Sequence, residues 1–257
     1  MEATEVQARL LYRLTGRGGR RGERGGMKTA EANGLWAAMN DEDKVILGRT
    51  AVLSHLPKDV VLLQRGDAVD RVFLPIDSDI SNVIHLANGM MSMASNVGRE
   101  GVTGLAAFMA DEPIGWDLLV AVEGLALMIP TAAFRERADA SPHLQQLLLS
   151  LTHYNQIEAA QNAVCNALHP VPARLARWLL MTQDRTGRDE YDLKQEDLAD
   201  LLGAQRTTIN SVLRAFSESE AVQSRRGRLR ILNRDALLRQ TCECYETIGS
   251  TRWRRGR

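Results

Sequence analysis

The chain has 257 residues, and its 32 Lys and Arg residues balance 32 Asp and Glu residues, so its formal net charge is zero. This length predicts one or two domains with a substantial apolar core. Three cysteines are too few for a disulfide framework and fit a reducing compartment. No apolar run is long enough to span a bilayer, and the N-terminus lacks the apolar core of a secretory signal. These features exclude an integral membrane protein and predict a cytoplasmic one.

The zero net charge conceals an uneven distribution of charge. Residues 1–26 carry +3, residues 27–168 carry −8 and residues 169–257 carry +5. A basic C-terminal part beside an acidic part suggests contact with nucleic acid. Residues 1–26 are rich in glycine and arginine and predict a disordered basic extension. A basic arm that contacts phosphate is the alternative for this segment.

Residues 27–140 are expected to form a β-rich sensory domain. Short β-rich runs at 60–64, 71–74, 81–86, 90–96 and 118–129 are separated by turn residues, a pattern typical of a sandwich or barrel. Asn88-Gly89 predicts a hairpin turn, because both residue types tolerate positive φ. The nearby methionines, Met90, Met91 and Met93, are expected to pack rather than to bind metal or haem.

Residues 141–169 are expected to form one long helix. Ser141 can cap its start and Pro142 suits its first turn. Apolar residues at helical spacing form a stripe along this helix: Leu144, Leu147, Leu148, Leu151, Tyr154, Ile157, Val164 and Leu168. The polar residues Glu158 and Gln161 interrupt the stripe. This interruption predicts that the helix packs partly on its own domain and partly on a second copy, as in a homodimer.

Residues 170–257 are expected to contain a winged helix-turn-helix, because residues 193–232 follow the order helix, turn, helix, hairpin. Gly203 is placed for the tight turn between the two helices. Apolar residues at helical spacing form the inward faces of these helices: Leu198, Leu201 and Leu202 in the first, and Ile209, Val212, Leu213 and Phe216 in the second.

The polar residues of this region match the chemistry of DNA. Arg206, Thr207, Asn210 and Ser211 are expected to face outward near the start of the second helix, where a recognition helix contacts base edges. Arginine pairs bidentately with guanine, and asparagine with adenine. Thr208 and Lys194 suit phosphate, and the hairpin forms a basic wing with Arg225, Arg226, Arg228 and Arg230. An ordinary helical hairpin with solvated charges is the alternative.

The order of these parts resembles the cyclic-AMP receptor/Fnr (Crp/Fnr) family of bacterial transcription regulators over roughly residues 50–246. The resemblance is strongest at 172–176 (PARLA), 198–203 (LADLLG) and 206–209 (RTTI). It implies an α+β fold: a cyclic-nucleotide-binding-type β jelly roll, a long dimerisation helix and a C-terminal winged helix-turn-helix. It also implies a homodimer that binds a palindromic double-stranded DNA site and works with RNA polymerase.

Some individual positions have the residue that is usual in the family, and others differ from it. Arg206 falls on the family's base-reading arginine, and Thr208 falls on its phosphate-contacting threonine. Many members have a glutamate where Thr207 stands, and the receptor has an arginine where Ser211 stands, so its operator does not transfer to this protein. Lys194 replaces the usual capping threonine, so the helix is capped by Asp192 or has a weaker start.

The candidate effector pocket departs further. An ungapped register puts Ile114 and Gly115 where cyclic-nucleotide binders carry the Arg-Ser pair that holds the phosphate, and an apolar side chain cannot neutralise phosphate. The same register puts Gly104 at the position of the family's ribose-binding glutamate. Glu100 can bind the ribose only if the alignment is shifted locally. Residues 159–160, Ala159 and Ala160, replace the hydroxyls offered to the base. Cyclic AMP is therefore not expected as the effector. A different small molecule, a dinucleotide or no ligand at all remains open.

Cofactor chemistry is not expected either. An iron–sulfur cluster would need thiolates near the N-terminus, yet no cysteine precedes Cys165. Cys242 and Cys244 could bind a metal or form a redox pair, but without a nearby histidine they are interpreted as ordinary thiols. The histidines show no ligand spacing, so neither a metal site nor haem is predicted: His85, His143, His153 and His169.

The sequence is compatible with two classes of function. The leading hypothesis is a sequence-specific DNA-binding regulator. The alternative is a small-molecule-binding or protein-interaction module that binds DNA only weakly, in which case deleting residues 170–257 would leave its physiological role intact. No catalytic residue is predicted, because the chain has no Walker loop, nucleophile elbow or metalloprotease helix.

Overall fold

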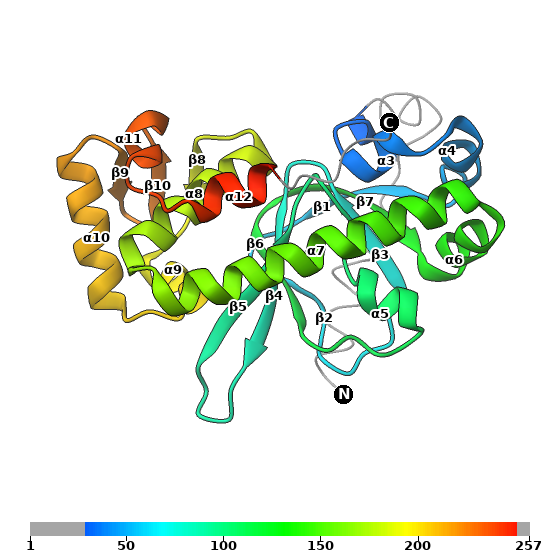
Figure 1. Cartoon of the computed structure of the whole chain (residues 1–257), viewed down its shortest axis with the longest axis horizontal. Coiled ribbons are helices and arrows are strands. Elements are labelled where there is room, and N and C mark those ends of the chain that lie inside the picture. Colours follow the sequence, from blue (N-terminus) through cyan, green and yellow to red (C-terminus); the bar gives the residue numbers. More distant parts are fainter. Residues whose placement is uncertain (1–28, 251–257) are drawn as a thin grey trace.

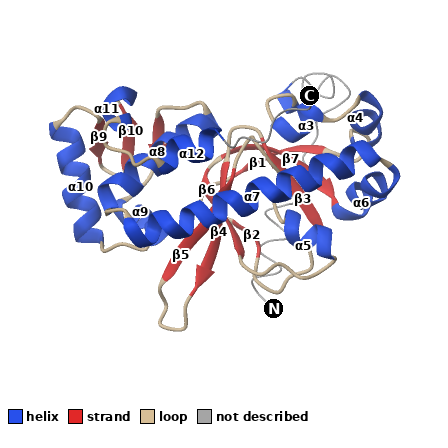
Figure 2. Ribbon diagram, viewed as in Figure 1, coloured by secondary structure: helices blue, strands red, loops and turns tan. Residues whose placement is uncertain are grey.

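The computed structural model describes residues 29–250. The predicted disordered extension, residues 1–26, lies outside this range. Within it, no helix combines the length and the apolar character needed to cross a membrane. Figure 2 shows the strands of the N-terminal domain on one side and a smaller, mainly helical C-terminal domain on the other, with one long helix extending between them.

The N-terminal domain contains two antiparallel sheets with a core between them. One sheet has the order β1-β7-β3, with β1 (Val52–Leu56), β7 (Gly124–Pro130) and β3 (Arg71–Pro75). The other has the order β2-β6-β4-β5, with β2 (Val61–Leu63), β6 (Asp117–Val122), β4 (Asp79–His85) and β5 (Met91–Val97). Buried side chains from both sheets, including Phe73, Ile80 and Leu118, form this core.

The predicted β-rich runs all contain strands, but two details differ. Strand β1 was not expected, and the run 118–129 is two strands in different sheets. The chain changes sheet at Gly124, where a Cβ would lie 2.6 Å from the carbonyl oxygen of Asp77, so only glycine allows this backbone approach. The predicted hairpin joins β4 and β5, and Gly89 takes a positive φ of 81°.

Short helices of the described part of the chain flank the sandwich: α3 (Gly34–Ala38), α4 (Asp41–Leu47), α5 (Leu105–Ala110) and α6 (Thr131–Ala140). The long helix α7 (Pro142–Leu168) confirms the predicted helix. Ser141 caps it by accepting a hydrogen bond from the Leu144 N–H at 3.1 Å. Figure 1 shows α7 running from the sandwich to the C-terminal domain.

The C-terminal domain has the predicted order helix, turn, helix, hairpin, in α9 (Gln195–Leu202), α10 (Arg206–Glu218), β9 (Val222–Arg225) and β10 (Arg228–Ile231). Gly203 ends α9 in the left-handed region, with φ of 57°. Strand β8 (Glu190–Asp192) completes a sheet of order β8-β10-β9. Three further helices surround this unit: α8 (Val171–Thr186), α11 (Arg234–Leu238) and α12 (Cys244–Ser250).

The two domains pack directly on each other. Met93, Ala121 and Val122 of the sandwich belong to the same buried cluster as the core of the C-terminal domain. At the edge of this contact, Lys58 Nζ lies 2.7 Å from Asp197 Oδ2 in the first turn of α9. The helix-turn-helix is therefore held against the sandwich rather than tethered by a linker alone.

Candidate nucleic-acid interface

The outer face of α10 is polar because the apolar residues of this helix, Ile209, Val212, Leu213 and Phe216, all face the core. Arg206, Thr207, Asn210 and Ser211 are exposed, and Thr208 is half-buried. The orientation predicted from helical spacing is confirmed. Base reading by these side chains stays a prediction.

The first turn of α9 contacts this outer face. Glu196 Oε1 lies 2.7 Å from Arg206 Nη1, and the Gln195 side-chain amide donates a 3.0 Å hydrogen bond to Asn210 Oδ1. Exposed ion pairs of this kind contribute no more than about 1 kcal/mol. DNA can therefore replace these partners at little cost, while Glu196 adds a negative charge that disfavours nearby phosphate.

The start of α9 lies beside the tip of the wing. Lys194 has no oxygen with which to cap the helix, and its backbone N–H donates a 2.9 Å hydrogen bond to Asp197 Oδ2. The N-cap residue is Lys194, so the expected cap by Asp192 is wrong, and the alternative of a weaker start stays a prediction. A Cβ on Gly227 at the wing tip would lie 3.6 Å from Lys194 Cγ. Lys194 and the wing tip thus form one continuous surface.

The wing has an exposed basic face. Arg228 and Arg230 alternate with buried Leu229 and Ile231 along β10, and Arg228 pairs with Arg225 across the hairpin. Their neighbour Glu190 lies 3.6 Å from Arg228. A surface hollow of about 450 Å³ is lined by Glu190, Gln223, Arg225, Arg226, Arg228 and Arg230. Four guanidinium groups around one carboxylate favour an anion such as a phosphate group.

The residues expected around the effector do not share one environment. A Cβ on Gly104 would lie 3.3 Å from Val69 and 4.0 Å from Ile114 Cδ1, so Gly104 and Ile114 are neighbours in an apolar setting. The Ile114 side chain is only 1% exposed and belongs to the core of the sandwich. Gly115, Ala159 and Ala160 are exposed on the surface. A phosphate placed beside Ile114 would lose its hydration without gaining a charged partner there.

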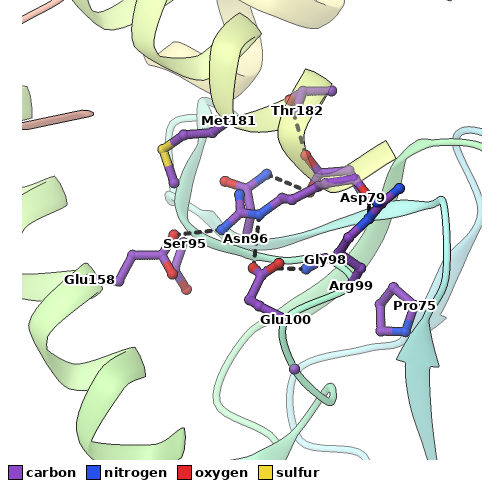
Figure 3. Close-up of polar contacts among 12 residues, drawn as sticks. Pro75, Asp79, Ser95, Asn96, Gly98, Arg99, Glu100, Glu158, Met181 and Thr182 are labelled. Carbon is purple, nitrogen blue, oxygen red and sulfur yellow. Dashed lines mark hydrogen bonds and ion pairs between the residues drawn. The ribbon is translucent and has the colours of Figure 1, made fainter. Parts of the chain in front are cut away.

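Glu100 is part of a polar cluster between the domains (Figure 3). Its Oε1 accepts a 3.1 Å hydrogen bond from the Gly98 N–H and a 2.8 Å bond from Arg185 Nε of α8. Arg185 Nη2 also pairs with Glu158 of α7 at 2.8 Å. The expected ribose ligand is therefore engaged with α8, and Glu158, which interrupts the apolar stripe of α7, has a buried cationic partner.

Asp79 extends this interdomain cluster, which we define as Asp79, Asn96, Glu100, Glu158, Thr182 and Arg185. Asp79 accepts hydrogen bonds from the Thr182 hydroxyl and the Asn96 amide, both at 3.0 Å. Burial raises the pKa of Asp79 and of Glu158, against the opposing charge of Arg185. Although burial disfavours its charged form, the Glu100 and Glu158 carboxylates hold the pKa of Arg185 well above its usual value.

Gly98 makes room for this cluster. A Cβ there would lie 2.4 Å from Arg185 Cγ, and the Arg99 guanidinium donates to the Arg185 carbonyl at 2.5 Å. The cluster joins the sandwich, α7 and α8. Sequence reasoning missed it, because its partners lie far apart along the chain. The feature of the sequence that could have indicated this cluster is Arg185, a charged residue on a helix whose other faces carry many apolar residues.

The thiols are also placed differently from expectation. Cys242 and Cys244 are free thiols, as interpreted from the sequence. The premise that no histidine is near them is wrong, because His169 Nδ1 lies 3.5 Å from Cys244 Sγ. Cys165 Sγ lies 3.6 Å from Cys242 Sγ. These residues meet because α12 packs beside the end of α7.

Comparison with known proteins agrees with the geometry of the helix-turn-helix. Residues 173–240 match the family model of the Crp-like helix-turn-helix domain. A CRP-like cAMP-activated global transcriptional regulator from Mycobacterium tuberculosis is 23% identical over 168 residues, which are 63% of this chain and 75% of the relative. Residues 173–240 therefore belong to the family of Crp-like helix-turn-helix domains, and the chain resembles Crp/Fnr regulators over most of its length.

Solved structures show that the chain shares its fold with Crp/Fnr regulators. A transcriptional regulator of the Crp/Fnr family from Eubacterium rectale superposes with a TM-score of 0.62 at 17% identity, covering 80% of this chain and 96% of that one. FixK2 from Bradyrhizobium japonicum gives 0.63 at 15% identity, covering 75% and 98%. The predicted α+β fold with a β-roll and a C-terminal helix-turn-helix is confirmed.

The family match identifies residues 173–240 as a helix-turn-helix domain of the Crp type, which is a DNA-binding domain. Its relatives are regulators rather than enzymes. The matched residues include α10 and the β9–β10 hairpin, for which the roles of recognition helix and wing stay predictions.

Proposed function

We propose that the protein regulates transcription in the cytoplasm as a homodimer that binds a palindromic DNA site, in partnership with RNA polymerase and without control by cyclic AMP. The observation that carries this proposal is the exposed pair Arg206 and Asn210 on α10. They share a surface with Lys194 and the basic wing tip. Phosphate contacts from the wing fix orientation, and contacts from α10 select bases.

The exposed apolar face of α7 supports the homodimer. Leu149, Val164 and Leu168 are 53%, 49% and 75% exposed in the single chain. They recur at helical spacing, with exposed Ala160 between them. A two-fold axis along α7 would bury both copies of this face, and it would present two recognition helices to two half-sites.

We expect the double substitution Val164→Glu and Leu168→Glu to give a monomer, because buried like charges would face each other across the two-fold axis. Light scattering after size-exclusion chromatography measures the mass. Affinity for a palindrome should fall on the order of 10²-fold, since the two half-sites are then bound separately. Val45→Glu is a matched control at an exposed apolar position on α4. A double variant that stays dimeric contradicts an interface on α7.

We expect millimolar cyclic AMP to leave the thermal midpoint unchanged, because the apolar Ile114 occupies the position of a phosphate-binding arginine. A ligand at about 100 times its Kd would stabilise the protein by about 2.7 kcal/mol. Differential scanning fluorimetry makes the measurement, with AMP as the control for ionic effects. A saturable upward shift with cyclic AMP and none with AMP would show that the missing-arginine argument is wrong.

A further inference from the structure

We propose that Cys165, His169, Cys242 and Cys244 bind one tetrahedral divalent metal of the zinc class at the junction between α7 and α8. One ligand atom from each residue lies within 4.8 Å of all the others. Three thiols and one imidazole make a donor set typical of structural zinc.

The distances fit a single metal ion. Zn–S bonds of about 2.3 Å and Zn–N bonds of about 2.0–2.1 Å at tetrahedral angles place ligand atoms about 3.8 Å (S to S) and about 3.6 Å (S to N) apart. Cys165 Sγ and Cys242 Sγ are 3.6 Å apart, and His169 Nδ1 and Cys244 Sγ are 3.5 Å apart. A cluster of several irons would hold its thiolates farther apart, so a mononuclear site fits better.

The groups around these ligands have the arrangement that supports a metal site. His169 Nε2, the ring nitrogen that faces away from Cys244, lies 3.4 Å from Glu243 Oε1. A carboxylate on the second nitrogen fixes the tautomer and orients the first nitrogen toward a metal. The Gln161 amide donates a 3.0 Å hydrogen bond to Cys244 Sγ, which suits a thiolate ligand.

The burial of the cysteines and the charges around them also suit a metal site. The three cysteines are buried in a cluster of their own, with Ala173 packed against them. Binding of a divalent ion releases three thiol protons to solvent and leaves three thiolates and the ion with a net charge of −1. The positive charges of Arg177 and Arg174 on α8 act on Cys165 and can offset this charge.

The position of the site indicates what the metal would hold together. Cys165 is in the last turn of α7, and His169 is its C-cap. Cys244 is the first residue of α12, beyond the winged helix, and Cys242 lies two residues before it. The metal would therefore fasten the C-terminal segment of the DNA-binding domain to the end of the long helix, across the connection at Pro170 from which α8 begins.

The test uses the full chain, purified under reducing conditions and dialysed against Zn²⁺. Plasma mass spectrometry should find one zinc per chain, and Co²⁺ in its place should give sulfur-to-cobalt charge-transfer bands with tetrahedral d–d bands. A folded protein that retains no zinc and gives no such bands overturns the proposal. A disulfide between Cys165 and Cys242, found in protein purified with zinc but without reductant, also overturns the proposal.

Variants locate the metal. Cys242→Ser, Cys244→Ser and His169→Gln should each abolish the cobalt spectrum, whereas His153→Gln, at an exposed position on the same helix, should leave it unchanged. Gln161→Leu removes only the hydrogen bond to Cys244, keeps all four ligands and should weaken zinc binding by about 10–100-fold. Circular dichroism identifies variants that fail to fold. Equal zinc content in the folded His169→Gln and His153→Gln proteins would contradict the proposal.

Discussion

Replacing Arg185 with methionine is expected to lower the free energy of unfolding by about 3–5 kcal/mol, because it leaves buried carboxylates without their cationic partner. The Arg185 side chain is 5% exposed and pairs with Glu158 and Glu100, both at 2.8 Å. Urea denaturation followed by tryptophan fluorescence measures the change. The same variant should alter DNA affinity, since Arg185 links α8 to α7 and to the sandwich.

Two further variants test this interpretation of Arg185. Adding Glu158→Gln to Arg185→Met should recover part of the lost stability, because one buried negative charge is removed. Arg214→Met breaks an exposed pair with Glu218 and should change stability by less than about 0.5 kcal/mol. If Arg185→Met costs no more than Arg214→Met, the interdomain cluster contributes little to the fold.

Replacing Arg206 with alanine is expected to remove about 1–3 kcal/mol of discrimination at one base position, because bidentate pairing with guanine is lost. Arg226→Ala should instead weaken binding to all sequences alike and reduce the salt slope by about 1. Arg226 has a positive φ of 51°. Alanine and arginine have a similar energetic cost at this positive φ, so Arg226→Ala mainly removes the positive charge. Titrations of fluorescent duplexes at several salt concentrations measure both effects.

A third variant separates the role of Arg206 from its ion pair. Glu196→Gln removes the carboxylate that lies 2.7 Å from Arg206, and it should keep the base preference while slightly raising affinity. If Arg206→Ala and Arg226→Ala weaken binding to all sites equally, Arg206 contacts phosphate rather than bases.

Local patterns were sufficient to predict much of the fold. The start of α7 followed from Ser141 and Pro142, because a cap and a first-turn proline act within a few residues. The outward face of α10 followed in the same way from the spacing of Ile209, Val212 and Phe216. Turn and helix signals depend on neighbours in sequence, so they can be recognised without the rest of the structure.

Features that depend on distant segments could not be predicted. The chain changes sheet at Gly124 because the backbone of Asp77 approaches it closely, which no local pattern shows. The pairing of Glu158 with Arg185 joins two helices, and sequence reasoning treated Glu158 only as an interruption of an apolar stripe. His169 meets Cys244 from 75 residues away. Such contacts depend on tertiary packing, whose partners the spacing along one chain does not specify.

The most direct test of the central claim is a selection of the full chain on random duplex DNA, followed by competition titrations at several salt concentrations. We predict an inverted repeat whose half-sites are centred about one helical turn, or a multiple of it, apart, about 10–10.5 base pairs per turn. The selected duplex should bind about 10³-fold or more tightly than random duplexes at the same salt concentration. Equal affinity for selected and random duplexes at every salt concentration would contradict a sequence-specific regulator.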